Sequence, residues 1–310
     1  MKIDDKRSFW ILPLAALFFL VLPFITPYKA LASQMLIFGI FAIGYDILFG
    51  YTGLLSFGHA AYFGLGAYGA GLSLVHLSVP TLPALLIGVI ISVLFALGIG
   101  YLSIRRRGIY FAMVTMAFAQ MIYFIVFKWR SLTGGSDGLQ GVPRPNVGPI
   151  NLSSELTLYY FILFFFMISV FLGIRIIHSP FGKAIECLRE NEDRARSVGF
   201  NPTRFKLMSF VISASFAGLA GGLYALLQNF VPLHALNLDT SGDIVLITLV
   251  GGKGTLYGPI LAAMVILFLK DLLTSYINIW PLFLGLFFVI SVMTFRRGIF
   301  KELKEKLLKF

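Results

Sequence analysis

"LYYFILFFFMISVFLGIRII", residues Leu158 to Ile177, decides the fold class of this chain. The stretch stays apolar for about the 20 residues that a helix needs to cross a bilayer, whereas a membrane barrel strand would alternate apolar and polar residues. The whole chain agrees, because 58% of its 310 residues are hydrophobic and 13% are charged, with a mean hydropathy of +0.88. Soluble domains carry about a quarter charged residues. The sequence predicts an integral membrane protein built from helices.

Similar apolar runs recur along the chain and predict an all-α polytopic bundle of about ten spans, some of them interrupted. The first run is expected to be a retained span, because no convincing cleavage site of small residues follows it. No segment outside the spans is long enough to fold alone, so residues 1–310 are expected to form one membrane domain. The expected spans are Phe9–Leu22, Leu31–Phe49, Phe57–Val75, Leu82–Leu102, Ile109–Phe127, Leu158–Ile177, Leu207–Leu227, Ile244 to about Val250, Ile260–Tyr276 and Leu282–Phe295.

The positive charges predict the orientation of the bundle. Lys and Arg near span ends are retained in the cytoplasm. Four segments hold 18 of the 25 Lys and Arg and 8 of the 14 Asp and Glu, and their net charge of +10 nearly equals the chain's +11: Met1–Arg7, Arg105–Arg107, His178–Lys206 and Arg296–Phe310. Both termini are therefore expected in the cytoplasm, with residues 296–310 as a basic tail. The excess of positive charge is therefore explained by the orientation in the membrane. A nucleic-acid-binding face would interleave aromatic residues with Lys and Arg, and the sequence has no such pattern.

Two glycine-rich stretches predict interruptions in the helices. They are "FGYTGLLSFGHAAYFGLGAYGAG" at Phe49–Gly71 and "LVGGKGTLYGP" at Leu249–Pro259. Each glycine weakens a helix by about 1 kcal/mol relative to alanine, and irregular backbone at membrane depth must be buried or line a wet cavity. Transporters often build solute sites from such breaks. We expect a solute path lined by Thr52, Gly53, Ser56, Gly58, His59, Gly66, Gly251, Gly252, Gly254 and Thr255; the alternative is that these are packing and turn residues.

Two ionisable residues, Asp46 and His59, lie near the first break. Asp46 sits close to the end of its expected span, and an ionisable residue inside a span is a functional candidate. It is included in the expected path, with a structural partner role as the alternative. His59 either serves the path or is a neutral, hydrogen-bonded packing residue.

The segment His178–Lys206 predicts an amphipathic helix outside the membrane. Ser179 followed by Pro180 is a helix start, and Ile185 and Leu188 share an apolar face. The segment mixes six basic with four acidic residues, whereas a helix lying on lipid would be more uniformly basic. We therefore expect the apolar face to enter a groove of a partner protein.

The chain lacks the residue patterns of an enzyme. Its single cysteine, Cys187, excludes an internal disulfide and leaves no thiol cluster for a metal. No paired carboxylates, histidine pair or nucleophile with a base stands at catalytic spacing. Neither Gly-Lys pair, at Gly182 and Gly252, is followed by Ser or Thr as a phosphate-binding loop requires. Any ATP hydrolysis is expected on another chain.

Four motifs, "GYTGLLSFGHAAYFGLGAY", "RGIYFAMVTMAFAQMI" followed by "TGGSDGL", "SPFGKAIECLRENEDRARSVGFNP" and "TLVGGKGTLYGPILAA", together resemble the LivM-type permease subunits of bacterial ABC importers for branched-chain amino acids. The resemblance implies a permease domain in the inner membrane, paired with a sister permease, two cytosolic ATPase subunits that hold ATP, and an extracytoplasmic binding protein. It makes residues 179–194 the coupling helix that docks on an ATPase. The coupling residues implied are Pro180, Phe181, Gly182, Ile185, Leu188, Arg189, Glu190, Asn191 and Glu192.

Several functions remain open at the level of sequence. The expected solutes are branched-chain or related hydrophobic amino acids, and the first alternative is an ABC permease for urea or short amides. A second alternative is a secondary transporter. An ion-coupled carrier is expected to have several carboxylates inside the membrane, and the one we identify is Asp46. We expect this chain to bind no cofactor. Its outer helices are expected to contact membrane lipid.

Overall fold

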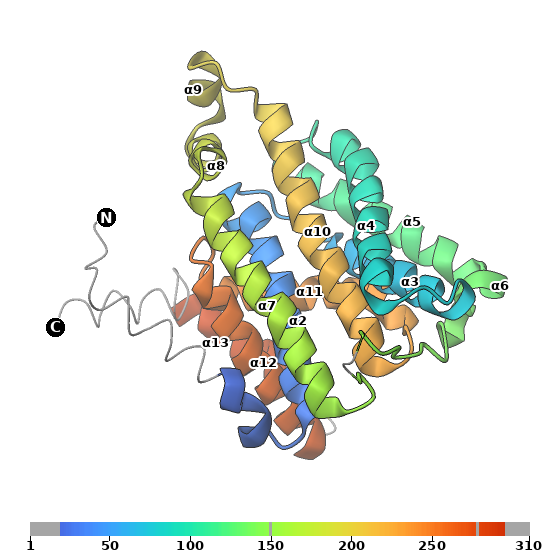
Figure 1. The fold of residues 1–310 in the computed structure, drawn as a ribbon. Coiled ribbons are helices and arrows are strands. Elements are labelled where there is room, and N and C mark those ends of the chain that lie inside the picture. Colours follow the sequence, from blue (N-terminus) through green and yellow to red (C-terminus); the bar gives the residue numbers. More distant parts are fainter. Residues whose placement is uncertain (1–18, 149–150, 277–278, 295–310) are drawn as a thin grey trace.

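The computed structural model describes residues 19–148, 151–276 and 279–294 of the 310-residue chain. Within these ranges the structure is helical and without strands, and an isolated bridge joins Leu139 to Val231. The predicted all-α class is confirmed (Figure 1). Residues 19–25 are helical, and the elements that follow are α2 (Lys29–Asp46), η1 (Ile47–Tyr51), α3 (His59–His76), α4 (Thr81–Ser103), α5 (Ile109–Lys128), α6 (Arg130–Thr133), η2 (Gly135–Asp137), α7 (Glu155–His178), α8 (Pro180–Glu190), α9 (Glu192–Ser197), α10 (Pro202–Gln228), η3 (Leu233–Leu236), α11 (Leu238–Gly251), α12 (Tyr257–Tyr276) and α13 (Trp280–Thr294).

Six segments are long and apolar enough to cross a membrane. They are α2 with η1, α4, α5, α7, α10 and α12. The helices α11 and α13 have 14 and 15 residues and are shorter than a full span. The count of about ten spans stays a prediction. Most of its first span, and the predicted tail at 296–310, lie outside the described residues.

Helix α2 forms the centre of the bundle. Its apolar window is 94% buried, against 33% for α4, α5 and α7. It packs against α10, α7 and α12, which surround it (Figure 1). A helix that is apolar all round is expected in such a position, because every face must be covered by other helices. The outer helices expose Leu, Ile, Phe and Met side chains, as a lipid-facing surface requires.

Small residues let α3, α4 and α10 approach one another closely. A Cβ added at Gly66 of α3 would lie 2.2 Å from the backbone oxygen of Gly218 on α10. One added at Gly221 would lie 1.8 Å from the carbonyl oxygen of Phe63. The Ser92 hydroxyl of α4 donates across the contact to the Tyr62 carbonyl at 2.8 Å. These three helices are packed backbone to backbone.

The bundle has two distinct ends. At one, which we call the α8 end, α8 and α9 lie beyond the ends of α7 and α10, and Arg107 of the α4–α5 loop contacts Glu192 of α9 (Figure 1). At the other end, Leu139 and Val231 exchange backbone hydrogen bonds of 3.0 and 2.8 Å. Arg144 also donates there from Nε to the Leu226 carbonyl at 2.7 Å. Two of the four basic segments, Arg105–Arg107 and His178–Lys206, thus meet at the α8 end. The loops that carry Leu139 and Val231 meet at the opposite end.

Candidate functional site: two broken helices and the α8 segment

The first glycine-rich stretch breaks the chain between α2 and α3. Helix α2 widens into the single π-helical turn η1, residues 52–58 are non-helical, and α3 starts at His59. Gly53 has a φ of 81°, which favours glycine. The freed backbone is satisfied locally, because the Thr52 hydroxyl donates to the Ile47 carbonyl at 2.9 Å and Leu54 N–H to the Leu48 carbonyl at 3.0 Å. The interruption expected from the glycines is present.

His59 links three helices at this break. Its Nδ1 lies 3.0 Å from the hydroxyl of Ser56 and its Nε2 lies 2.7 Å from the hydroxyl of Ser213 on α10. Tyr45 of α2 donates from its hydroxyl to the Ser56 carbonyl at 2.8 Å. The rings of Tyr45 and Phe210 meet the imidazole edge to face, with centroids 5.1 and 5.6 Å away. Both ring nitrogens are occupied and the side chain is fully buried. This geometry matches the packing alternative for His59.

The second glycine-rich stretch also breaks the chain, and it meets the first one. Helix α11 ends at Gly251, and Gly252, Gly254 and Leu256 all have positive φ before α12 begins. The Gly254 N–H donates to Oδ1 of Asp46 at 2.7 Å, and the Leu256 N–H donates to Oδ2 at 3.1 Å. Asp46 is fully buried. Its carboxylate therefore closes the loop at 252–256 onto the end of α2.

Gly50 and Arg189 complete this junction. A Cβ at Gly50 would lie 2.0 Å from Oδ1 of Asp46 and 2.3 Å from the nitrogen of Gly254, so side chains are excluded. Arg189 of α8 donates from Nη1 to the carbonyl of Gly50. The nearest neighbour of a Cβ at Gly254 is that same Nη1, at 3.2 Å. The junction thus joins both broken helices to α8, and we call these four residues with Leu256 the Asp46 junction.

The predicted coupling helix at 179–194 is two helices. Ser179 caps α8, accepting from the Gly182 N–H at 3.3 Å, and Asn191 ends α8 and caps α9, accepting from the Arg194 N–H at 2.9 Å. Asn191 has extended backbone, so the helix cannot run through it. The single helix of the prediction is corrected to α8 followed by α9.

The apolar face of α8 points into the protein. Ile185 is fully buried and Leu188 is 4% exposed. Phe181 stacks on Phe205 of α10, with centroids 5.9 Å apart. The expectation that this face enters a partner's groove is therefore wrong for Ile185 and Leu188, because the chain's own bundle covers them.

The outward side of α8 is polar. Lys183, Cys187, Arg189 and Glu190 are exposed. Lys183 donates to Glu186 at 2.9 Å, and this hydrogen bond raises the pKa of Lys183 above its usual value. A hollow of about 170 Å³ lies between this polar side of α8 and α9. It is lined by Cys187, Glu190, Asn191, Arg194, Ala195, Val198 and Phe200. The polar side and this hollow are therefore the parts of α8 that the described chain leaves uncovered.

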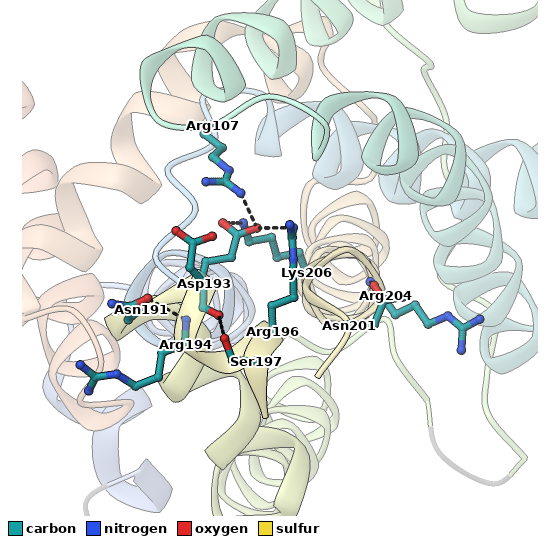
Figure 2. A network of polar contacts seen from close by, with 10 residues as sticks. Arg107, Asn191, Asp193, Arg194, Arg196, Ser197, Asn201, Arg204 and Lys206 are labelled. Carbon is teal, nitrogen blue, oxygen red and sulfur yellow. Dashed lines mark hydrogen bonds and ion pairs between the residues drawn. The ribbon is translucent and has the colours of Figure 1, made fainter. Parts of the chain in front are cut away.

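Glu192 holds α9 against the rest of the α8 end (Figure 2). Its carboxylate lies 2.7 Å from Nζ of Lys206 on α10, 3.1 Å from Arg107 and 3.9 Å from Arg196. The side chains of Glu192 and Lys206 are 18% and 10% exposed, so this pair is largely shielded from water. Figure 2 shows Arg107 reaching the cluster from a different segment than Lys206. One carboxylate therefore ties α9 to α10 and to the α4–α5 loop.

The residues predicted for the solute path fall into separate environments. Asp46, Gly254 and Thr255 belong to the second break, where the Thr255 hydroxyl donates to the Gly252 carbonyl at 2.6 Å. Gly251 packs against Gly258, and Gly66 packs against Gly218. Thr52, Ser56, Gly58 and His59 are buried at the first break. None of these polar side chains is exposed, and each of them bonds within the chain.

Sequence reasoning missed the partners of these residues. No local pattern marks Ser213 as the partner of His59, although a serine in a membrane helix can hydrogen-bond across to a neighbouring helix. Lys206 and Arg107 were counted only as cytoplasmic charges. The described residues hold no cluster of His, Cys, Asp and Glu suited to a metal.

The chain resembles known membrane transport proteins over most of its length. The family described as "Branched-chain amino acid transport system / permease component" matches residues 28–294, which include every helix from α2 to α13. The LivM permease protein of the high-affinity branched-chain amino acid transport system of Salmonella typhimurium is 28% identical over 300 residues, covering 89% of this chain and 71% of that protein. Its Escherichia coli counterpart is 27% identical with the same coverage. A probable LivH permease protein of Methanocaldococcus jannaschii is 24% identical, covering 76% of each chain. No solved structure matches.

Proposed function

Because the chain belongs to the family of permease components of branched-chain amino acid transport systems, we propose that it is the membrane subunit of an ATP-driven importer. It is a multi-pass membrane protein and a transport component, not an enzyme. Its solutes are branched-chain or related hydrophobic amino acids, which a binding protein delivers for passage into the cytoplasm. The observation that carries the proposal is the match over residues 28–294.

The α8 end faces the cytoplasm of a bacterial inner membrane, with both termini on that side. Support comes from the contact of Arg107 with Glu192, which brings two of the basic segments to one end. The opposite end, where Leu139 pairs with Val231, then meets the binding protein.

The partners are a sister permease subunit and two cytosolic ATPase subunits, which hold the ATP. Relatives named LivM and LivH, both permease proteins, support a permease pair. The ATPase contact is the polar side of α8 with the hollow beside Arg194, because the apolar side is covered by the chain itself. In this arrangement Glu190 and Asn191 remain contact residues for the ATPase. Ile185 and Leu188 instead anchor α8 to the chain's own helices.

The Asp46 junction transmits movement of α8 to the broken helices. Arg189 of α8 bonds to Gly50 of η1, and Asp46 at the end of α2 bonds to Gly254 beyond α11. A displacement of α8 therefore reaches both breaks. The breaks at 52–58 and 252–256 are the hinges of the solute path. The predicted path residues act there by shaping the backbone, since their polar side chains are bonded within the chain.

The experiment is solute uptake in cells that lack their own branched-chain amino acid transporters. The chain is co-expressed with its proposed sister permease, ATPases and binding protein, and labelled leucine, isoleucine and valine are compared with labelled urea and acetamide. We expect uptake of the three amino acids that stops when the ATPases carry an inactive phosphate loop. Uptake of urea alone supports the amide permease, and uptake by this chain without partners supports a secondary transporter.

A further inference from the structure

An ion pair joins α11 to α12 inside the helical bundle. Lys270 donates from Nζ to Oδ2 of Asp243 at 2.8 Å. Lys270 lies six residues before the end of α12 at Tyr276, which corresponds to about 9 Å along the helix axis. Asp271 lies in α12, which is long and apolar enough to cross a membrane, so Asp46 is not, as the sequence had suggested, the one carboxylate in a candidate span.

The pair points away from the lipid side of α12. The exposed apolar residues of this helix repeat at spacings of four, three and four: Leu261, Val265, Phe268 and Leu272. At 100° per residue, Lys270 lies on the face opposite to this stripe. Charged side chains at membrane depth face the bundle interior or a water-filled cavity, because lipid contact is costly. Lys270 therefore faces inward.

Both charges nevertheless remain accessible. The side chains of Lys270 and Asp243 are 28% and 23% exposed. Beside Asp243, a Cβ added at Gly242 would meet no atom within 4 Å, so the space there is open. The polar groups at the first break differ, because Ser56 and His59 are fully buried.

One face of α11 is open along its length. Asp239 is exposed, and Gly242, Asp243, Leu246 and Leu249 are half-buried. The residues between them on the other faces are buried, among them Ser241, Ile244 and Thr248. The open face carries Asp243 with Leu246 less than one turn further along the helix. It therefore offers charge and apolar surface side by side.

We propose that Asp243 and Lys270 form a binding site for the charged end of a zwitterionic amino acid on its way through the permease. The carboxylate of Asp243 binds the solute's ammonium group, the ammonium of Lys270 binds its carboxylate, and Leu246 contacts its aliphatic side chain. The solute replaces one internal ion pair by two charge-assisted contacts, so neither charge is left bare when the site empties. The inference rests on the proposed function, since it names the solute contacts of that permease.

The first test measures binding without transport. In the assembled complex, Cys187 is replaced by alanine and Gly242→Cys supplies a reporter thiol on the open face beside Asp243, where an added side chain has room. We expect leucine to slow labelling of this thiol by a maleimide, and Asp243→Asn or Lys270→Gln to weaken this protection about tenfold or more in leucine concentration. Leucinamide and 4-methylpentanoate, each lacking one charge, should protect weakly. Protection that persists in Asp243→Asn, or is absent while leucine uptake proceeds, overturns the proposal.

The second test separates binding from helix packing by exchanging the charges. The double variant Asp243→Lys with Lys270→Asp restores the ion pair but reverses its polarity. We expect this variant to assemble with its partners and to retain ATP hydrolysis while leucine uptake falls at least about tenfold. Uptake at the original rate in the exchanged variant means that the pair only holds α11 to α12. Absence of leucine uptake in the unaltered complex instead counts against the proposed function, so the two failures are distinguishable.

Discussion

Asp46 and Gly254 stand 208 positions apart in the chain, and the Gly254 N–H donates to Oδ1 of Asp46 at 2.7 Å. The other carboxylate oxygen accepts from Leu256 at 3.1 Å. Two helix breaks that the sequence predicts separately are therefore one structural unit. This unit lies beside Arg189 of α8, on the proposed cytoplasmic side.

Replacing Asp46 by asparagine should destabilise this junction. The amide keeps one acceptor oxygen and turns an NH₂ group toward a backbone N–H that then lacks its acceptor, at a cost of about 1–3 kcal/mol. We expect a lower melting temperature in detergent and faster hydrogen exchange at residues 252–256. The control is Asp137→Asn, at an exposed position in the loop at the opposite end. Equal melting temperatures for the two variants would show that Asp46 does not stabilise the junction.

Arg189 should matter for coupling more than for folding. Arg189→Met removes the donor to the Gly50 carbonyl while leaving the apolar anchor of α8 in place. We expect the complex to assemble and to hydrolyse ATP, with uptake per ATP reduced several-fold. Arg204→Met is the matched control, because Arg204 is exposed on the first turn of α10. If both variants transport equally, α8 does not act through Gly50.

Close helix contacts make certain glycines intolerant of even one methyl group. Gly221→Ala would place a Cβ 1.8 Å from the Phe63 carbonyl oxygen, and overpacking of this kind costs about 1–3 kcal/mol. We expect less inserted protein and a lower melting temperature. Gly98→Ala is the control, because nothing lies within 4 Å of that Cβ and alanine favours the helix. A Gly221→Ala protein as stable as Gly98→Ala would contradict the observed packing.

The shielded ion pair of Glu192 and Lys206 should contribute more to the stability of the α8 end than the exposed pair of Lys183 and Glu186. Glu192→Gln leaves three cations around an uncharged group, and a hydrogen bond to a charged group contributes about 1.5–3 kcal/mol. We expect α9 to exchange its amide hydrogens faster. Glu186→Gln removes only an exposed pair and should leave the exchange of α9 close to that of the unaltered protein. Similar exchange in the two variants would mean that Glu192 does not hold α9.

The sequence allowed the helix class, both breaks and the α8 segment to be predicted, because these depend on composition and local spacing. Glycine content predicts where a helix breaks, but the partner of Asp46 comes from a segment 208 residues away. Periodicity identified the apolar face of α8 by Ile185 and Leu188, yet a pattern does not say what covers a face. Gly58 illustrates the same limit, since a Cβ there would meet the Thr115 backbone oxygen at 2.3 Å.

As the permease of an ATP-driven importer, this chain should move no solute alone. The most direct measurement is leucine uptake into liposomes that hold either the purified chain or the full complex, with the loaded binding protein outside and ATP inside. We predict no uptake by the chain alone under a proton or sodium gradient, and uptake by the complex only when ATP is present. Leucine accumulation by the chain alone, driven by an ion gradient, would show that the chain is a secondary transporter and not the subunit of an ATP-driven importer.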